Sequence, residues 1–303
     1  MKLNCRTIVA LWLLACTAAN AQVDVQPNGD FNYAEVLYNG WPARKLDIVF
    51  IGDGYTAAEQ GVFNTHVEDA LQAMQTTPPY ANLMCAFNVW RVNVVSLDSG
   101  IDRPSLSLFY NTELDVRFGD PAAGETERCI RSDSPQKIDE AASHAPAANL
   151  IVVLANTSFH GGCAPGIVYS GTGPGWWGTF IHELSHRIGG LADEYHTDNR
   201  DYTFSEPPYP NVTRFSDFAS IKWNDLIDLA TPLPTIDDIP QGVVGAFEGG
   251  WGVFATGIFR PQFTCMMKSL GSSFCAVCDR TIRQNLAFNC DSCDPFAGVG
   301  VCR

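Results

Sequence analysis

The sequence predicts an α/β fold in which helices cover both faces of a β-sheet. Residues 46–52 and 149–155 are continuous apolar runs with the length of a buried strand, and residues 87–95 are rich in β-branched and aromatic side chains. After the first run, the capping box Thr56-x-x-Glu59 opens a segment with apolar residues at helical spacing. Strands that are apolar along their whole length and alternate with helices indicate a sheet covered on both faces.

The C-terminal part of the chain has a different texture. From about Pro207 onward, segments rich in proline, glycine and aromatic residues replace the strong periodicities, which predicts a smaller, irregular lobe. Within it, residues 216–229 around Trp223 and residues 278–286 are expected to form helices. Earlier in the chain, Pro135 is expected to open a short helix, because proline is favoured in the first helical turn.

The composition is that of a folded, acidic, globular protein. Of the 303 residues, 46% are hydrophobic and 11% aromatic, which is enough for a sizeable core in one large domain or two joined lobes. With 33 Asp and Glu against 19 Lys and Arg, the net charge is −14. Nucleic-acid binding needs an excess of basic residues, so this balance argues against nucleic acid as a partner.

The N-terminus has the three parts of a secretion signal. Lys2 and Arg6 form the positive end, residues 8–15 the apolar stretch, and residues 19–21 a small-residue cleavage site. The apolar run is too short to span a bilayer, and no later run is long enough. We therefore expect residues 1–21 to be a signal peptide and the protein to be secreted, in the periplasm or outside the cell.

A second interpretation of this segment is a lipid anchor. Residues 13–16 resemble a lipoprotein cleavage box, in which Cys16 carries the lipid. Leu14 fits that box imperfectly, so soluble export is the favoured prediction.

Cysteine usage agrees with export. Two of the 11 cysteines fall in the predicted signal, and the nine that remain suit an oxidising compartment with several disulfides. The odd number leaves at least one thiol unpaired or bonded outside the chain. The pairs Cys275-x-x-Cys278 and Cys290-x-x-Cys293 can instead hold a structural zinc ion through four sulfur atoms, but disulfides are favoured in an exported chain.

The strongest motif is His182-Glu183-x-x-His186. Two histidines four residues apart on an α-helix lie on one face, where both can bind one metal ion. Glu183 is rotated about 100° around that helix, so it sits beside the metal and can take a proton from water there. Because this arrangement is typical of zinc metallopeptidases, the sequence predicts a catalytic Zn²⁺ site with Glu183 as the general base.

A third ligand is expected just after this helix. Gly189 and Gly190 end the helix and let the chain turn back. The metzincin pattern has a third histidine where this chain has Ala192, which cannot bind metal. Asp193 is the favoured ligand with Glu194 hydrogen-bonding nearby, and Glu194 as the ligand is the alternative. Three protein ligands leave the fourth tetrahedral position open, as catalysis requires.

Two features around the motif, Tyr195 and residues 166–170, have two interpretations each. Tyr195 can donate a hydrogen bond to the oxyanion formed in hydrolysis, although packing beside the third ligand is favoured. Residues 166–170 predict a short edge strand that either pairs with an extended peptide or is an ordinary edge. His160 is interpreted as a polar residue of the Gly-rich loop before that strand.

With these blocks in place, the chain resembles the IgA-peptidase-like family of bacterial zinc metallopeptidases. The resemblance covers most of the mature chain, and its most specific part is the run from His182 to Asp193-Glu194-Tyr195. Less specific blocks are residues 47–56, 87–92, 245–250, 265–268 and 274–278.

This resemblance implies a zinc-dependent endopeptidase of metzincin-like architecture that cleaves a protein or peptide. The expected fold is a twisted mixed sheet flanked by helices as the upper lobe, and a smaller, irregular, cysteine-rich lower lobe, with the substrate cleft between them. The expected lobes are residues 22–190 and 191–303. Met267, or second Met266, is expected to form a hydrophobic floor beneath the metal. The cysteine-rich tail after residue 290 matches no family pattern.

The same metal site also permits an alternative function. A zinc hydrolase of a non-protein amide, such as a cell-wall or acyl-amino-acid bond, needs the same ligands and base. Substrate choice depends on the loops of the cleft, which the fold does not specify.

Overall fold

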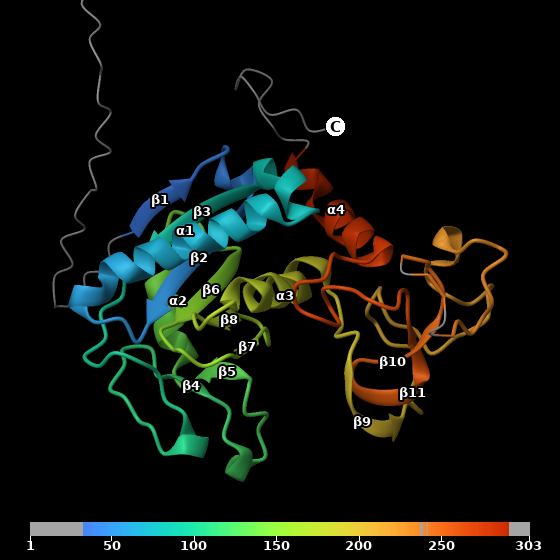
Figure 1. Ribbon diagram of the computed structural model, residues 1–303. Helices are drawn as coiled ribbons and strands as arrows, with labels where there is room; N and C mark the ends of the chain where they lie inside the picture. Colours follow the sequence, from blue (N-terminus) through green and yellow to red (C-terminus); the bar gives the residue numbers. More distant parts are fainter. Residues whose placement is uncertain (1–32, 237–238, 241, 291–303) are drawn as a thin grey trace, which may run out of the picture.

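The largest element of the computed structural model is a six-stranded mixed sheet (Figure 1). The structure describes residues 33–236, 239–240 and 242–290, so the predicted signal peptide, Cys16 and the C-terminal tail lie outside the described residues. The strand order is β1-β3-β2-β6-β8-β7, in which the four inner strands run parallel and the two outer strands antiparallel to their neighbours. The strands are β1 (Tyr33–Leu37), β2 (Leu46–Asp53), β3 (Phe87–Val92), β6 (Leu150–Ala155), β7 (Gly162–Cys163) and β8 (Val168–Gly171).

Helices cover both faces of this sheet, as predicted. Along β2, Ile48 and Phe50 belong to one apolar cluster and Val49 and Ile51 to another, because successive side chains of a strand point to opposite faces. The first cluster contains the buried faces of α1 and α3, and the second contains that of α2. The helices are α1 (Gln60–Thr76), α2 (Pro135–Ala142), α3 (Trp176–Gly189) and α4 (Ala276–Cys290).

The local signals for α1 and α2 are confirmed. The Thr56 N–H donates to the Glu59 carboxylate at 2.9 Å, and this capping box opens a 3₁₀ turn, Ala57–Glu59, that leads directly into α1. Helix α1 ends at Thr76, and Pro135 is the first residue of α2. Strand β3 ends at Val92 and is therefore shorter than the predicted segment 87–95.

The strand predicted at residues 166–170 is present as β8, but its predicted position at the edge of the sheet is wrong. Strand β8 lies between β6 and β7, because the Gly-rich loop folds back and pairs Gly162 with Ser170. The outer strand is β7, and its outward-facing Gly162 N–H donates to the Arg128 carbonyl oxygen at 3.0 Å. The sheet edge on this side is therefore partly occupied by the chain itself.

After Gly190 the chain forms a second, three-stranded sheet that Figure 1 shows apart from the six-stranded one, with α3 running from one towards the other. Its order is β10-β11-β9. A two-stranded sheet, β4-β5, lies near β7. These strands are β4 (Val116–Phe118), β5 (Ile130–Ser132), β9 (His196–Asp201), β10 (Phe247–Gly250) and β11 (Gly252–Arg260).

Of the two helices predicted in this part, one is present. Helix α4 contains the predicted segment 278–286 and is longer at both ends. Residues 216–229 contain only a 3₁₀ turn at Asn224–Leu226, so the predicted helix there is wrong. The buried Trp223 indole N–H donates to the Gly245 carbonyl oxygen at 2.8 Å, and this tertiary contact holds an irregular chain in place of a helix.

One apolar core joins the two parts of the chain. Phe50 and Phe180 share it with Met267, Val277 and Leu286. The predicted division of the chain at residue 190 stays a prediction. Among the described residues, no helix has the length and apolarity needed to cross a membrane.

Candidate active site

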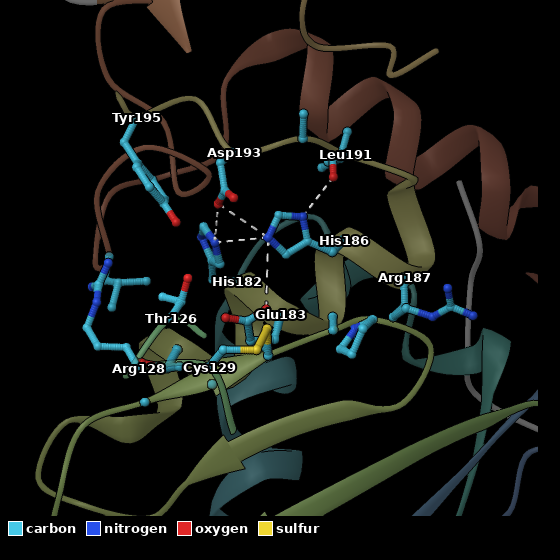
Figure 2. A pocket seen from close by; sticks show the side chains of 18 of the residues that line it. Thr126, Arg128, Cys129, His182, Glu183, His186, Arg187, Leu191, Asp193 and Tyr195 are labelled. Atoms are coloured by element: carbon cyan, nitrogen blue, oxygen red, sulfur yellow. Dashed lines mark hydrogen bonds and ion pairs between the residues drawn. A yellow bond between two sulfur atoms is a disulfide. The ribbon is translucent and has the colours of Figure 1, made fainter. Parts of the chain in front are cut away.

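Helix α3 brings the two motif histidines together. His182 and His186 are one turn apart, and their Nε2 atoms are 3.1 Å from each other (Figure 2). His182 is buried and His186 keeps 19% of its side chain exposed, so solvent reaches the pair from one side.

Asp193 reaches the same point from the segment that follows α3. Gly190 ends the helix with φ +58°, a left-handed conformation that glycine adopts without strain, and the chain turns back. The Asp193 Oδ1 atom then lies 2.9 Å from His182 Nε2 and 3.4 Å from His186 Nε2. The structure thus brings together the two histidines and the favoured third residue.

Two backbone carbonyl groups orient the imidazole rings. His182 Nδ1 lies 3.1 Å from the Met266 oxygen, and His186 Nδ1 lies 2.7 Å from the Leu191 oxygen. A carbonyl oxygen only accepts hydrogen bonds, so both Nδ1 atoms carry the proton. In the neutral rings, the Nε2 lone pairs then point at each other and at the Asp193 carboxylate. Three lone-pair donors this close need a cation between them, and the donor set fits a metal ion.

Electrostatics agree with a cation at this point. Burial opposes ionisation of Asp193, but in the metal-free site a proton on Nε2 of His182 or His186 donates a hydrogen bond to this carboxylate, which outweighs burial and holds the pKa of the carboxyl well below its usual range. Burial also opposes the charged form of His186, but Asp193 outweighs it and raises the pKa of this imidazole to about 9. Without a metal, the carboxylate therefore favours a proton in the position where a metal would bind.

Glu183 lines the same pocket and lies on the side of the two histidines that is opposite to Asp193 (Figure 2). Its Oε2 atom is 3.9 Å from His186 Nε2, and its side chain is 12% exposed. Burial raises the pKa of the Glu183 carboxyl, which makes it a better proton acceptor than an exposed glutamate.

The cluster opens into a cavity of about 750 Å³. One wall comes from the Gly-rich loop and β7, where a disulfide joins Cys129 to Cys163. The opposite wall comes from the segments after α3, including Asp193 and Trp251. A cavity of this size admits part of a polymeric substrate.

A comparison with protein families now assigns the chain. A family model described as IgA Peptidase M64 matches residues 34–239 and 236–286, which is most of the chain. The chain belongs to the IgA peptidase M64 family. It is a metallopeptidase, which implies a metal cofactor and a peptide substrate. A search of curated proteins finds no match.

Glu194, the alternative ligand, turns away from the histidines in this peptidase. Its Oε1 atom accepts hydrogen bonds from Asn211 Nδ2 at 3.0 Å and from the Cys278 thiol at 3.2 Å. Asn211 also bonds both the N–H and the carbonyl oxygen of Ala192, so it holds the segment that carries Asp193.

Tyr195 and the two methionines lie beside the pocket. The Tyr195 ring is nearly parallel to that of His182, with centroids 6.4 Å apart, and burial raises the pKa of its hydroxyl to about 12. Met266 and Met267 are buried in the core. Besides the Met266 carbonyl bond to His182, the Met267 oxygen accepts the Glu194 N–H at 2.7 Å, which ties this segment to the one after α3.

Neither interpretation of the pair Cys275-x-x-Cys278 is found: both cysteines are free thiols rather than the favoured disulfide partners, and Cys290 does not join them in the alternative four-sulfur zinc site. Cys275 and Cys278 lie with Cys265 at the start of α4, whereas Cys290 is the last residue of this helix and its sulfur lies 2.8 Å from that of Cys85. Cys293 lies outside the described residues. The spacing alone did not show that Cys278 lies near the start of α4 and Cys290 at its end.

Several residues of the peptidase pocket were missed from the sequence. Arg128 and Thr126 line it from the loop before β5, and Lys268 and Trp251 line it from the C-terminal part. His160, interpreted as a polar loop residue, also lines it, 3.3 Å from Thr179. Lys268 belongs to the block 265–268 of the family resemblance, which could have pointed to it. The others come from separate loops and belong to no motif, so no sequence signal could have placed them in the pocket.

Proposed function

We propose that this metallopeptidase is a secreted zinc-dependent endopeptidase with His182, His186 and Asp193 as the metal ligands. The observation that carries the proposal is the convergence of two Nε2 lone pairs and a carboxylate beside Glu183, whose side chain is largely but not fully buried. Two nitrogens and one oxygen suit zinc, and three protein ligands leave an open position for chemistry.

When bound, zinc supplies Lewis acidity that polarises the scissile carbonyl group and acidifies water. Glu183 acts as the general base that takes the proton from the attacking water. It then hands this proton to the nitrogen of the leaving amine, so the carboxyl returns to its starting state. The Met266 and Leu191 carbonyl groups keep both Nε2 atoms free for the metal.

The wider architecture is proposed to be metzincin-like. The cavity walls support this interpretation, since one comes from the Gly-rich loop and β7 and the other from the chain after α3, like an upper and a lower lobe. Met267 is fully buried in the adjoining core and is the proposed hydrophobic floor, with Met266 second. Secretion is supported by the N-terminal signal pattern and by the Cys129–Cys163 disulfide, which suits an oxidising compartment.

The test compares the wild type with Glu183→Gln. We expect the variant to keep its zinc, measured by elemental analysis, and to cleave casein or a peptide library about 10²–10⁴-fold more slowly. Glu140→Gln, on the exposed face of α2, is the control and keeps full activity. If the turnover of Glu183→Gln equals that of the wild type, the proposed mechanism is wrong. Cleavage of muropeptides without cleavage of any polypeptide would favour the non-protein amide hydrolase instead.

A further inference from the structure

A second group of metal-ligating side chains lies apart from the histidines. Glu194, Cys265, Cys275 and Cys278 place one ligand atom each within 4.8 Å of all the others. Cys275 and Cys278 lie at the start of α4, Cys265 precedes them, and Glu194 follows α3. All four residues are at most 2% exposed.

The spacing of these atoms fits a tetrahedral zinc site. Bonds of about 2.3 Å to sulfur and about 2.0 Å to oxygen place neighbouring ligand atoms roughly 3.5 Å apart. The Glu194 Oε1 atom lies 3.2 Å from the Cys278 sulfur and 3.6 Å from the Cys275 sulfur. Backbone N–H groups also donate to sulfur, from Cys275 to Cys265 at 3.2 Å and from Cys278 to Cys275 at 3.4 Å. Such bonds favour thiolates, which are the form that binds metal.

The Glu194 carboxylate gives an independent indication. Its Oε2 atom is buried and has no hydrogen-bond partner among the described residues. A fully buried carboxylate is costly unless it is paired or binds a metal. The buried Arg260 offers charge at longer range, but its Nη1 donates to the carbonyl oxygens of Glu248 and Gly249.

We propose that Glu194, Cys265, Cys275 and Cys278 bind a second, structural zinc ion. Four protein ligands in a fully buried site leave no position for substrate, so this ion has no catalytic role. Its ligands join the segment after α3, the segment around Met266 and the start of α4. Glu194 adjoins Asp193 in the chain, and the Met266 carbonyl oxygen bonds His182. The second ion therefore holds the segments that place Asp193 and orient His182 in the catalytic site.

The first experiment uses the wild-type protein. Elemental analysis is expected to find about two zinc ions per chain, since both sites bind in the folded state. Cobalt substitution is expected to give an intense thiolate-to-metal charge-transfer band, which the sulfur-free histidine site cannot produce. One zinc ion per chain together with no such band overturns the proposal, as does a disulfide between any two of the three cysteines. This result is independent of whether the protein cleaves peptides.

Matched variants locate the second ion. His186→Ala is expected to lose one zinc equivalent and keep the cobalt–thiolate band. Cys278→Ser is expected to lose the band, whereas Cys85→Ser, which removes a cysteine outside the group, keeps it. A band that survives in Cys278→Ser at full intensity contradicts the assignment. Should Cys278→Ser fail to fold, the wild-type zinc content and cobalt spectrum still decide the question.

Discussion

The protonation of the paired histidines depends on two carbonyl oxygens that belong to other segments. Met266 and Leu191 hold the Nδ1 protons of His182 and His186, which leaves both Nε2 atoms as lone-pair donors. Both are backbone carbonyl groups, so a side-chain substitution does not remove them. At the scale of single residues, the informative substitutions are therefore side chains beside the ligands.

Tyr195→Phe tests for an oxyanion donor. Its hydroxyl lines the cavity beside Asp193, and the ring packs parallel to His182. Loss of one preorganised donor is expected to lower kcat by about 10²–10³-fold, because the oxyanion forms only in the transition state. KM and zinc content stay near the wild-type values. If steady-state kinetics show an unchanged kcat, Tyr195 has only the packing role.

Asn211→Ala tests the support of the third ligand. Its amide bonds both polar backbone groups of Ala192 and the Glu194 carboxylate, and it is fully buried. Removing it leaves these groups unpaired, so we expect the free energy of unfolding to fall by about 2–4 kcal/mol. Denaturant titration measures the loss. Asn199→Ala, on the exposed strand β9, is the control and should stay within about 0.5 kcal/mol.

At the scale of elements, α3 does the most to build the site. Its apolar face packs on the sheet, and this contact directs His182 and Glu183 into the cavity. Its C-terminus is held by Asn285 of α4, which donates to the Ile188 carbonyl oxygen at 2.9 Å. The helix therefore positions the histidines, and its end determines where Asp193 arrives.

Gly190→Ala tests this helix end. A Cβ at Gly190 meets no atom within 4 Å, so the cost comes only from the left-handed backbone at φ +58°. We expect a loss of about 1–2 kcal/mol in the free energy of unfolding. Gly190→Asn should lose less, because asparagine tolerates this conformation. Equal losses in the two variants would show that the backbone conformation is not the cause.

At the scale of the whole molecule, one apolar core connects the sheet, α3 and α4. The cavity is lined by segments that precede and follow α3, and this core holds both. The shape of the cavity therefore depends on the core staying intact. Because this core is shared by both parts of the chain, we expect a surface charge network to affect the stability of the whole fold.

Acid stability tests the network around Glu125. Hydrogen bonds from Arg117, then from the Asp120 N–H, lower the pKa of Glu125 from 4.5 to about 2. Because the folded-state pKa is lowered, the network stabilises the fold above pH 4.5 and loses its effect as the pH falls towards about 2. Glu125→Gln should lower the thermal unfolding midpoint above this window and approach the wild type below it. If the two unfolding midpoints differ by the same amount at every pH, the assignment is wrong. Because both proteins are measured at the same pH, loss of metal at low pH affects both and does not enter the difference.

Local patterns predicted much of the fold and the centre of the site. Apolar runs predicted β2 and β6, and the Thr56 capping box and Pro135 predicted the starts of two helices, because these signals involve residues close together in the chain. The helix expected around Trp223 failed because a distant carbonyl, that of Gly245, determines the local chain. The edge strand failed because a Gly-rich loop leaves few side chains that reveal its pairing.

By itself, the sequence determined which residues share one face of a helix, and hence that His182 and His186 can meet at one point. Tertiary structure decided between the two acidic side chains that follow: Asp193 faces the histidines, whereas Glu194 enters a buried group of cysteines. The physical reason is that adjacent side chains leave the backbone in different directions. Which of them reaches the histidines depends on Asn211, Met267 and α4, all distant in the chain.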